Sequence, residues 1–263
     1  MLRKALRDGN PSTLLRRNTS HGLIVAVDPD SIMDSEVVRQ GYYEPEILDA
    51  ILTHLPENEV FWDVGANFGM HAITVQSLRP NARVIAFEPS PVPLSRLTYN
   101  VLLNASQVTI LPIALGNATG YAQMEIKVSG NTGISSLSPW PGSRYDGHLT
   151  ARVETGDALI SSGLVPRPSV IKIDVEGFER EVLVGLSCLC DSAKNLTLVF
   201  ESNAEKLGPI MELLEASGFT VSPIFAVGQS SGTNYLARKT QGHRLIMAQL
   251  ELGGSQLEHG EEV

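Results

Sequence analysis

The chain has 263 residues, enough for one large α/β domain with appendages or for two small domains, and 43% of them are hydrophobic while 19% are charged. Its formal net charge of −9 argues against a general nucleic-acid binder or a membrane-surface protein, because both need a basic surface to meet phosphates. No uninterrupted apolar run reaches the roughly 18 residues that a membrane span requires.

The amino-terminal segment MLRKALRDGNPSTLLRR is basic but lacks the apolar stretch of a secretory signal. Its composition fits either a basic amphipathic helix on the surface or a frayed leader. The two cysteines, Cys188 and Cys190, lie too close in sequence for an easy disulfide, and no second pair completes a zinc site. We therefore expect reduced thiols and a cytoplasmic protein.

Residues 1–58 are expected to form a helical extension or lid ahead of the main domain. The segment QGYYEPEILDAILTHL (40–55) spaces its apolar residues as in a helix that packs on a core. These apolar residues are Ile47, Leu48, Ile51, Leu52 and Leu55.

After residue 58, short β-branched runs alternate with helix-like stretches, and we place the main domain at residues 59–240. The expected strands are Val60–Val64, Arg83–Glu88, Val108–Pro112, Val170–Asp174 and Leu196–Glu201. The expected helices are Met70–Leu78, Pro93–Leu103, Phe178–Leu186 and Glu205–Ser217. Apolar strands that alternate with helices indicate a doubly wound parallel sheet. FTVSPI and NYLARK follow without a clear helix between them, so we expect an antiparallel pair at the sheet edge.

An insertion at residues 116–168 interrupts this alternation. Two hairpin-like pieces, YAQMEIKV and LTARVETG, flank SGNTGISSLSPWPGSRYDG, which is rich in Gly, Ser and Pro and is read as a loop. Long loops in compact domains are usually functional or disordered, so the insertion is expected to form a binding region. The polar tail at 253–263 is expected to be disordered.

The segment EVFWDVGANFGMHAITVQSL (59–78) runs from a strand through a glycine turn into a helix. A dinucleotide site expects G-x-G-x-x-G, with the middle glycine against the pyrophosphate. Here Asn67 takes the middle position and Gly69 comes one residue early. Asparagine tolerates positive φ, but its side chain would crowd a pyrophosphate. The turn therefore favours a phosphate-free ligand that offers an anion to the helix N-terminus, such as S-adenosylmethionine.

Glu88 ends the second expected strand about 25 residues further on. A carboxylate there can accept two hydrogen bonds from ribose hydroxyls, and it would repel a ribose phosphate. A cap or a solvated residue is the alternative for Glu88 alone. Together with Asp63 and the glycine turn, it indicates a nucleoside ligand.

Six segments occur in the order and spacing of the FkbM-type S-adenosylmethionine-dependent methyltransferases. They are DVGANFG, AFEPSP, ALGNATG, TGISSL, IKIDVEGFE and LVFES. The chain resembles that family over roughly residues 44–238. The resemblance implies a class I methyltransferase (Rossmann-like) fold: an α/β protein with a seven-stranded, mostly parallel sheet, helices on both faces and the last strand antiparallel. It also implies O-methylation of a small-molecule hydroxyl, on a sugar or secondary metabolite.

Parallel strands bind ligands at their carboxyl ends, where Asp63, Glu88, Asp174 and Glu201 are expected to share one cleft. Each of the four has a plain alternative as a helix cap. With the resemblance, the expected cofactor-binding residues are Asp63, Gly65, Asn67, Phe68, Gly69, Glu88, Pro89, Ser90, Ala114, Leu115 and Asp174.

Asp174 is expected nearest to the methyl position, where it would orient the acceptor hydroxyl, take its proton or help to hold Mg²⁺. Glu176 and Glu201 would supply further oxygen ligands for the metal, but we favour metal-free action. His71 and His148 are competing candidates for the general base, and simple packing near the cofactor is the alternative for His71.

The expected acceptor-binding residues are Tyr43, Glu44, Ser135, Ser136, Trp140, Glu176 and Glu201. Tyr43 and Glu44 precede the first strand and would close over the cofactor or the acceptor, although an aromatic residue that covers the core explains Tyr43 as well. Ser135, Ser136 and Trp140 belong to the long loop, and Trp140 could stack on a ring. A flexible loop tip is the alternative for these three residues.

Two other functions stay open at this point. An NAD(P)-dependent Rossmann oxidoreductase needs the G-x-G-x-x-G that this turn lacks. A catalytically inactive methyltransferase-like binding module would share the motifs of the enzyme, and uptake of S-adenosylmethionine followed by turnover separates the two.

Overall fold

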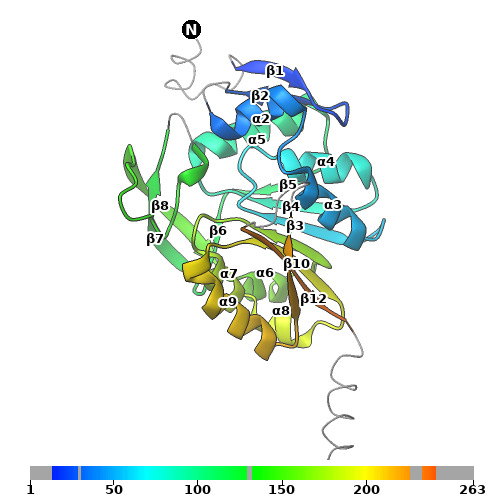
Figure 1. Ribbon diagram of the computed structural model, residues 1–263, viewed down its shortest axis with the longest axis vertical. Helices are drawn as coiled ribbons and strands as arrows, with labels where there is room; N and C mark the ends of the chain where they lie inside the picture. Colours follow the sequence, from blue (N-terminus) through cyan, green and yellow to red (C-terminus); the bar gives the residue numbers. More distant parts are fainter. Residues whose placement is uncertain (1–13, 29–30, 129–131, 226–232, 241–263) are drawn as a thin grey trace, which may run out of the picture.

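The computed structural model describes residues 14–28, 31–128, 132–225 and 233–240. The expectations for residues 1–13 and for the tail at 253–263 lie outside this part of the chain. At the centre is a seven-stranded sheet with the order β11-β12-β10-β9-β3-β4-β5 (Figure 1). Its strands are β3 (Val60–Val64), β4 (Arg83–Phe87), β5 (Thr109–Leu111), β9 (Val170–Ile173), β10 (Leu196–Glu201), β11 (Thr220–Ile224) and β12 (Asn234–Lys239).

The pairing of these strands confirms the predicted fold class. The neighbours β10-β9, β9-β3, β3-β4 and β4-β5 are parallel, whereas β12 runs antiparallel to both β10 and β11. Every residue of β3 and β9 is buried, because helices cover both faces of the sheet. The carboxyl ends of β3, β4 and β9 therefore meet at one edge, where the chain leaves the sheet into loops.

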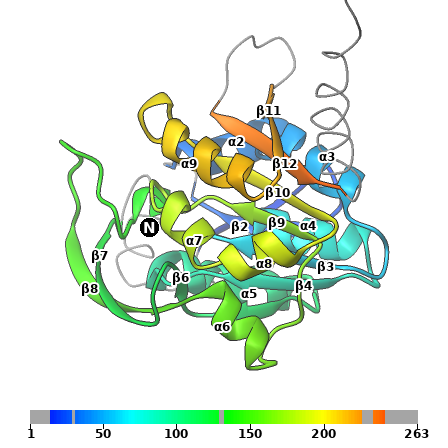
Figure 2. The same ribbon diagram turned by 90° about the horizontal axis from the view of Figure 1, so that it is seen from below.

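Helices lie in two layers, one on each side of the sheet (Figures 1 and 2). One layer contains α2 (Ile32–Gln40), α3 (Pro45–His54), α4 (Met70–Leu78) and α5 (Pro91–Leu103). The other contains α6 (Gly156–Ser161), α7 (Glu179–Val184), α8 (Ser187–Ser192) and α9 (Ala204–Ala216). The helix expected at 178–186 is α7, which ends slightly earlier, and α8 follows beyond the expected range. A Cβ on Gly185 would lie 1.9 Å from the Gly116 carbonyl oxygen, so the chain passes the insertion closely between these helices.

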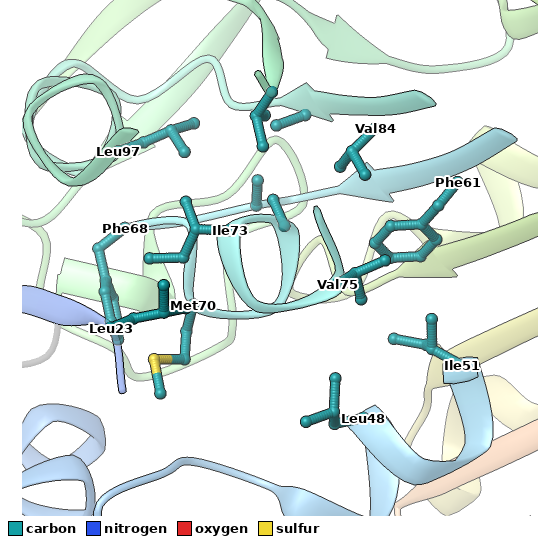
Figure 3. Packing of buried hydrophobic residues seen from close by; sticks show 14 of the residues in the cluster. Leu23, Leu48, Ile51, Phe61, Phe68, Met70, Ile73, Val75, Val84 and Leu97 are labelled. Atoms are coloured by element: carbon teal, nitrogen blue, oxygen red, sulfur yellow. The ribbon is translucent and has the colours of Figure 1, made fainter. Parts of the chain in front are cut away.

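Alternate residues of the strands supply the two cores. Phe61 and Val84 pack with Ile51, Ile73 and Leu97 on the α2–α5 side, and Figure 3 shows these side chains converging around α4. On the other side, a separate buried cluster joins residues of the same strands to α6–α9. Its largest strand residues are Trp62, Phe87, Ile171 and Phe200.

The region before β3 is not purely helical, which corrects the expected helical extension. It begins with an antiparallel pair, β1 (Leu15–Asn18) and β2 (Ile24–Val27), and continues into α2 and α3. The β2 strand is anchored on α5, because the Asn100 side chain accepts a hydrogen bond of 2.8 Å from the Ala26 N–H. The β1 strand is exposed along its length, so no hydrophobic alternation marks it in the sequence.

The insertion contains the predicted hairpin. Strands β7 (Gly120–Ile126) and β8 (Gly147–Glu154) pair antiparallel, and β6 (Ala114–Leu115) joins β8 to complete a three-stranded sheet. Figure 2 shows this ribbon extending beyond the main sheet. A short 3₁₀ turn, Thr132–Ile134, follows, and the backbone of Ser136 then pairs with Glu125. The loop is thus brought back toward the carboxyl edge of the main sheet.

Helices long and apolar enough to cross a membrane do not occur among the described residues.

Candidate active site

A pocket with about 640 Å³ of empty space, open at its mouth, lies at the carboxyl edge of the main sheet. Five segments form its walls, together with Met33 of α2, Pro93 and Met124. From the turn after β3 come Val64, Gly65 and Asn67; from the end of β4 come Phe87, Glu88, Pro89 and Ser90. The segment after β5 contributes Ile113, Ala114 and Leu115, and the insertion loop contributes Gly133, Ser135, Ser136 and Leu137. The segment after β9 contributes Asp174, Val175, Glu176 and Phe178.

The turn between β3 and α4 uses positive φ at three positions: Gly65 (78°), Asn67 (52°) and Gly69 (88°). A Cβ at Gly65 would lie 1.8 Å from the carbonyl oxygen of Asp174, and a Cβ at Gly69 would lie 2.4 Å from Cδ1 of Leu97. The glycines therefore allow this turn to approach the end of β9 and helix α5. Asparagine tolerates its left-handed conformation, as the sequence predicts.

Gly65→Ala is expected to be much more destabilising than Gly163→Ala. Both glycines have positive φ, but nothing lies within 4 Å of a Cβ at Gly163. The control change should cost about 1–2 kcal/mol of unfolding free energy for the left-handed backbone alone. The clash with Asp174 should add about 1–3 kcal/mol to this cost at Gly65. Denaturant unfolding of the two variants measures the difference, and equal costs would contradict the close approach.

Glu88 is buried and its carboxylate is fixed by backbone donors. Its Oε2 accepts a hydrogen bond of 2.9 Å from the Asn67 N–H, and its Oε1 accepts one of 2.8 Å from the Ser90 N–H. Burial raises the pKa of Glu88 to about 7, although these N–H groups favour the ionised form. Each carboxylate oxygen has room for a further hydrogen bond. The group can thus receive two hydroxyl donors from the pocket.

Asn67 links the glycine turn to the amino-terminal region. Its Nδ2 lies 3.6 Å from the sulfur of Met33 on α2, and its Oδ1 is buried without a hydrogen-bond partner among the described residues. A buried acceptor without a partner at a pocket wall fits a ligand with an N–H or O–H donor. Asn67 and Glu88 therefore suit a nucleoside such as that of S-adenosylmethionine.

Asp63 and Asp174 flank a buried lysine that the sequence analysis missed. Lys172 Nζ donates to Asp174 Oδ2 at 3.0 Å and lies 3.6 Å from Asp63 Oδ1. Asp174 lines the pocket, whereas Asp63 is fully buried behind it, and neither carboxylate oxygen of Asp63 has a hydrogen-bond partner in the described chain. The sequence did contain a signal for this role, namely a lysine within an otherwise apolar expected strand that ends in an aspartate. Such a lysine must be paired with a carboxylate when it is buried.

Further carboxylates gather beside Asp174. Burial and the charge of Asp174 raise the pKa of Glu176 to about 7, and Trp140 Nε1 donates to Glu176 Oε2 at 3.2 Å. Burial, with the charges of Asp174, Glu176 and Glu44, raises the pKa of Glu201 to about 8. We call Glu44, Asp174, Glu176 and Glu201 the acidic cluster. Within it, Glu176 and Glu201 take up protons near neutral pH.

The raised pKa values of Glu88 and of two members of the acidic cluster predict that the cofactor-free protein loses stability as the pH rises. Glu88, Glu176 and Glu201 have folded-state pKa values of about 7, about 7 and about 8, against 4.5 without the fold. Between pH 4.5 and about pH 8, the folded chain therefore binds more protons than the unfolded chain. The stability that these protonated groups contribute is lost as the pH rises through about 7 to about 8. We expect the Tm to fall between about pH 5 and about pH 8 and then to level off, with a shallower slope for Glu201→Gln. A flat profile would contradict these shifts.

The structure brings only part of the predicted residue set into the pocket. The residues that line it are Gly65, Asn67, Glu88, Pro89, Ser90, Ala114, Leu115, Ser135, Ser136, Asp174 and Glu176. Phe68 points into the core instead (Figure 3), where Arg96 lies over its ring. Ser136 Oγ donates to the Glu176 carbonyl at 2.8 Å, and Trp140 is held between Glu176 and the Lys206 ammonium, which lies 4.6 Å from its ring centre.

The two histidine candidates lie away from the pocket lining. His71 is buried on α4, with Nδ1 3.2 Å from the Tyr42 hydroxyl and Nε2 3.9 Å from Glu44 Oε2. His148 is exposed on β8, opposite Glu125. Tyr43 is close enough to Glu44, Asp174 and Glu201 that burial, together with these charges, raises the pKa of its hydroxyl. It lies next to the acidic cluster but is not itself part of the pocket wall.

The described residues contain no group of three or more His, Cys, Asp or Glu side chains placed to hold a metal ion. They also offer no oxidoreductase pair at the pocket. Tyr235 and Lys239 have a Tyr-x-x-x-Lys spacing, but both lie on the strand β12, where Lys239 donates to the carbonyls of Cys190 and Asp191. The site therefore combines the buried Glu88 carboxylate with the acidic cluster.

Comparison with known proteins shows the family of this chain. Residues 63–221 match the family model described as the methyltransferase FkbM domain. The hexuronic acid methyltransferase AglP of Haloferax volcanii is 35% identical over 144 residues, which cover 55% of this chain and 56% of the relative. The 31-O-demethyl-FK506 methyltransferase FkbM of Streptomyces tacrolimicus is 28% identical, over 65% of this chain and 78% of the relative. This chain thus spans only about half the length of AglP.

A solved structure shows the same fold. The precorrin-6y C5,15-methyltransferase of Geobacter metallireducens GS-15 superposes with a TM-score of 0.51 at 16% identity, covering 83% of this chain and 94% of that one. The seven-stranded sheet with its antiparallel β12 is the class I methyltransferase fold.

Proposed function

This chain belongs to the FkbM family of methyltransferases, and we propose that it transfers a methyl group from S-adenosylmethionine to a hydroxyl of a small molecule. The observation that carries the proposal is the Glu88 carboxylate, held by two backbone N–H groups in a pocket that also contains Asp174. A pocket of this kind suits a ligand that combines a ribose with a positive charge, because one end offers a hydroxyl acceptor and the other offers carboxylates.

The residues of the pocket divide between the parts of the cofactor. Glu88 would accept hydrogen bonds from the ribose hydroxyls, and the apolar wall of Ala114, Leu115 and Phe178 suits the adenine. Asn67 Oδ1, buried without a partner among the described residues, would accept a donor of the cofactor. Met33 of α2 lines the pocket, which supports a role of α2 as part of a lid over this end of the pocket.

Asp174 is the residue that we propose for the chemistry. The bound cofactor supplies an electrophilic methyl group, and an alcohol attacks it well only as its proton leaves. Asp174 would hold the acceptor hydroxyl and take that proton, because its side chain is 24% exposed and reaches the pocket. We propose that this step needs no metal ion. The part of the site that would hold the acceptor would be lined or supported by Tyr43, Glu44, Ser135, Ser136, Trp140 and Glu201.

The acidic cluster favours a hydroxyl over a carboxylate as the acceptor group. Above about pH 8, where Glu176 and Glu201 are ionised, a carboxylate placed near the acidic cluster would meet like charges, and such a contact disfavours binding. Sugars and hydroxyl-bearing secondary metabolites avoid this repulsion. The relatives, a hexuronic acid methyltransferase and a 31-O-demethyl-FK506 methyltransferase, support a small molecule as the acceptor.

A screen of candidate acceptors for release of S-adenosylhomocysteine, with and without EDTA, tests the proposal. We expect release with a neutral sugar or polyketide alcohol, and an unchanged rate in EDTA. Release that EDTA abolishes would replace the metal-free proposal with a metal-dependent one. Tight cofactor binding without release on any acceptor would favour the inactive binding module.

A further inference from the structure

Lys172 is a cation in the interior of the sheet, and it is not among the residues that line the pocket. It lies on β9, directly opposite Asp63 of β3 in the parallel register, and only 5% of it is exposed. Burying an ammonium group is costly unless it is paired and hydrogen-bonded. The partners of Lys172 therefore indicate what it is for.

Both partners are aspartates, but they differ in exposure. Asp63 is 0% exposed and lies 3.6 Å from the ammonium, whereas Asp174 accepts its hydrogen bond at 3.0 Å and reaches the pocket. Burial disfavours the ammonium, yet the charges of Asp174, Asp63 and Glu44 together raise the pKa of Lys172 above its usual range. Lys172 thus stays charged and joins a fully buried carboxylate to a carboxylate of the pocket.

The side chain of Asp174 depends on this cation for its place. Its backbone is fixed independently, since the Asp174 N–H donates to the Val64 carbonyl at 3.0 Å and Gly65 packs against its carbonyl oxygen. Beyond the backbone, Glu176 and Glu201 lie near Asp174, and each repels it when ionised. Among the described residues, Lys172 is the one cation paired with it. Loss of the ammonium would leave the carboxylate repelled on its other sides.

We propose that Lys172 is a positioning residue: its ammonium, anchored by Asp63, holds Oδ2 of Asp174 and so keeps that carboxylate aimed into the pocket. The inference rests on the proposed role of Asp174 in the transfer. It also gives Asp63 a task different from the expected contact with the cofactor, because Asp63 acts from behind the pocket through Lys172.

A purely structural role is the competing explanation, in which Lys172 only neutralises Asp63. The matched pair Asp63→Asn and Asp63→Asn/Lys172→Met separates the two roles. Both variants lack the buried carboxylate of residue 63, so removal of the ammonium in the double variant leaves no unpaired charge there. The two variants therefore differ only in the cation at position 172. Asp63→Leu/Lys172→Leu is a second version without the cation, in case the first double variant does not fold.

Crystal structures of these variants with S-adenosylhomocysteine measure the position of Asp174 directly. We expect it unchanged in Asp63→Asn, because an amide oxygen at this position still faces the ammonium and keeps it in place. In the double variants we expect Asp174 displaced by about 1 Å or more, with turnover on the acceptor from the screen about 100-fold below that of Asp63→Asn. The Tm values report the structural contribution separately. An Asp174 carboxylate in the same place with and without Lys172 would overturn the inference.

Calorimetric titration of the unmodified chain with S-adenosylmethionine keeps this test apart from the proposed function. If the unmodified chain binds the cofactor but Asp174 stays in place in the double variants, only the role of Lys172 fails. If the unmodified chain does not bind the cofactor, the proposed function fails, and the crystal structures still decide whether Lys172 positions Asp174.

Discussion

Glu88→Ala is expected to weaken the binding of S-adenosylmethionine more than tenfold, because hydrogen bonds to a charged group are each worth about 1.5–3 kcal/mol. The change removes the acceptor proposed for the ribose hydroxyls and leaves the Asn67 and Ser90 N–H groups without their partner. Calorimetric titration measures the dissociation constant, and a thermal melt of the free variant checks that the fold is intact.

Two further variants make this result specific. Glu215→Ala removes a carboxylate that is exposed on α9 and away from the pocket, so its dissociation constant should equal that of the unmodified chain. Glu88→Gln keeps the size of the side chain and one acceptor oxygen, so its affinity should fall between the other two. An unchanged dissociation constant in Glu88→Ala would reject the ribose assignment.

Asp174→Asn is expected to retain cofactor binding and to lose turnover by about 10²–10⁴-fold, the usual range for removal of a general base. The amide has nearly the same shape as the carboxylate and can still accept a hydrogen bond from Lys172, so the pocket should keep its form. It cannot take the proton of the acceptor hydroxyl. Parallel measurements of kcat and of the cofactor dissociation constant separate these effects, and full activity in this variant would move the chemistry to another residue.

The sheet and its main helices could be predicted because their sequence patterns are local. The strand Val60–Val64 and the helix Met70–Leu78 have the same bounds in the structure as in the prediction, because an almost wholly apolar strand is followed directly by the glycine turn. The β1 strand was not predicted, because its exposed LRRN sequence has no alternation to detect. Its pairing with β2 depends on contacts to α5, which lies more than 70 residues away in the chain.

The site shows the same division between local and distant information. Glu88 and Asn67 were predicted from a turn and a strand end, and both line the pocket. Phe68 follows the same motif but faces the core, because the turn reverses direction at Asn67 and packs Phe68 under α5. Met33 and Lys172 were missed, because their roles arise from α2 folding over the turn and from the register between β3 and β9.

A crystal structure of the chain with S-adenosylmethionine tests the central claim most directly. We expect the ribose hydroxyls within hydrogen-bonding distance of Glu88, the adenine against Ala114 and Leu115, and the methyl group directed toward Asp174. A pocket that stays empty at saturating cofactor, or one that takes up NADH instead, would contradict the account.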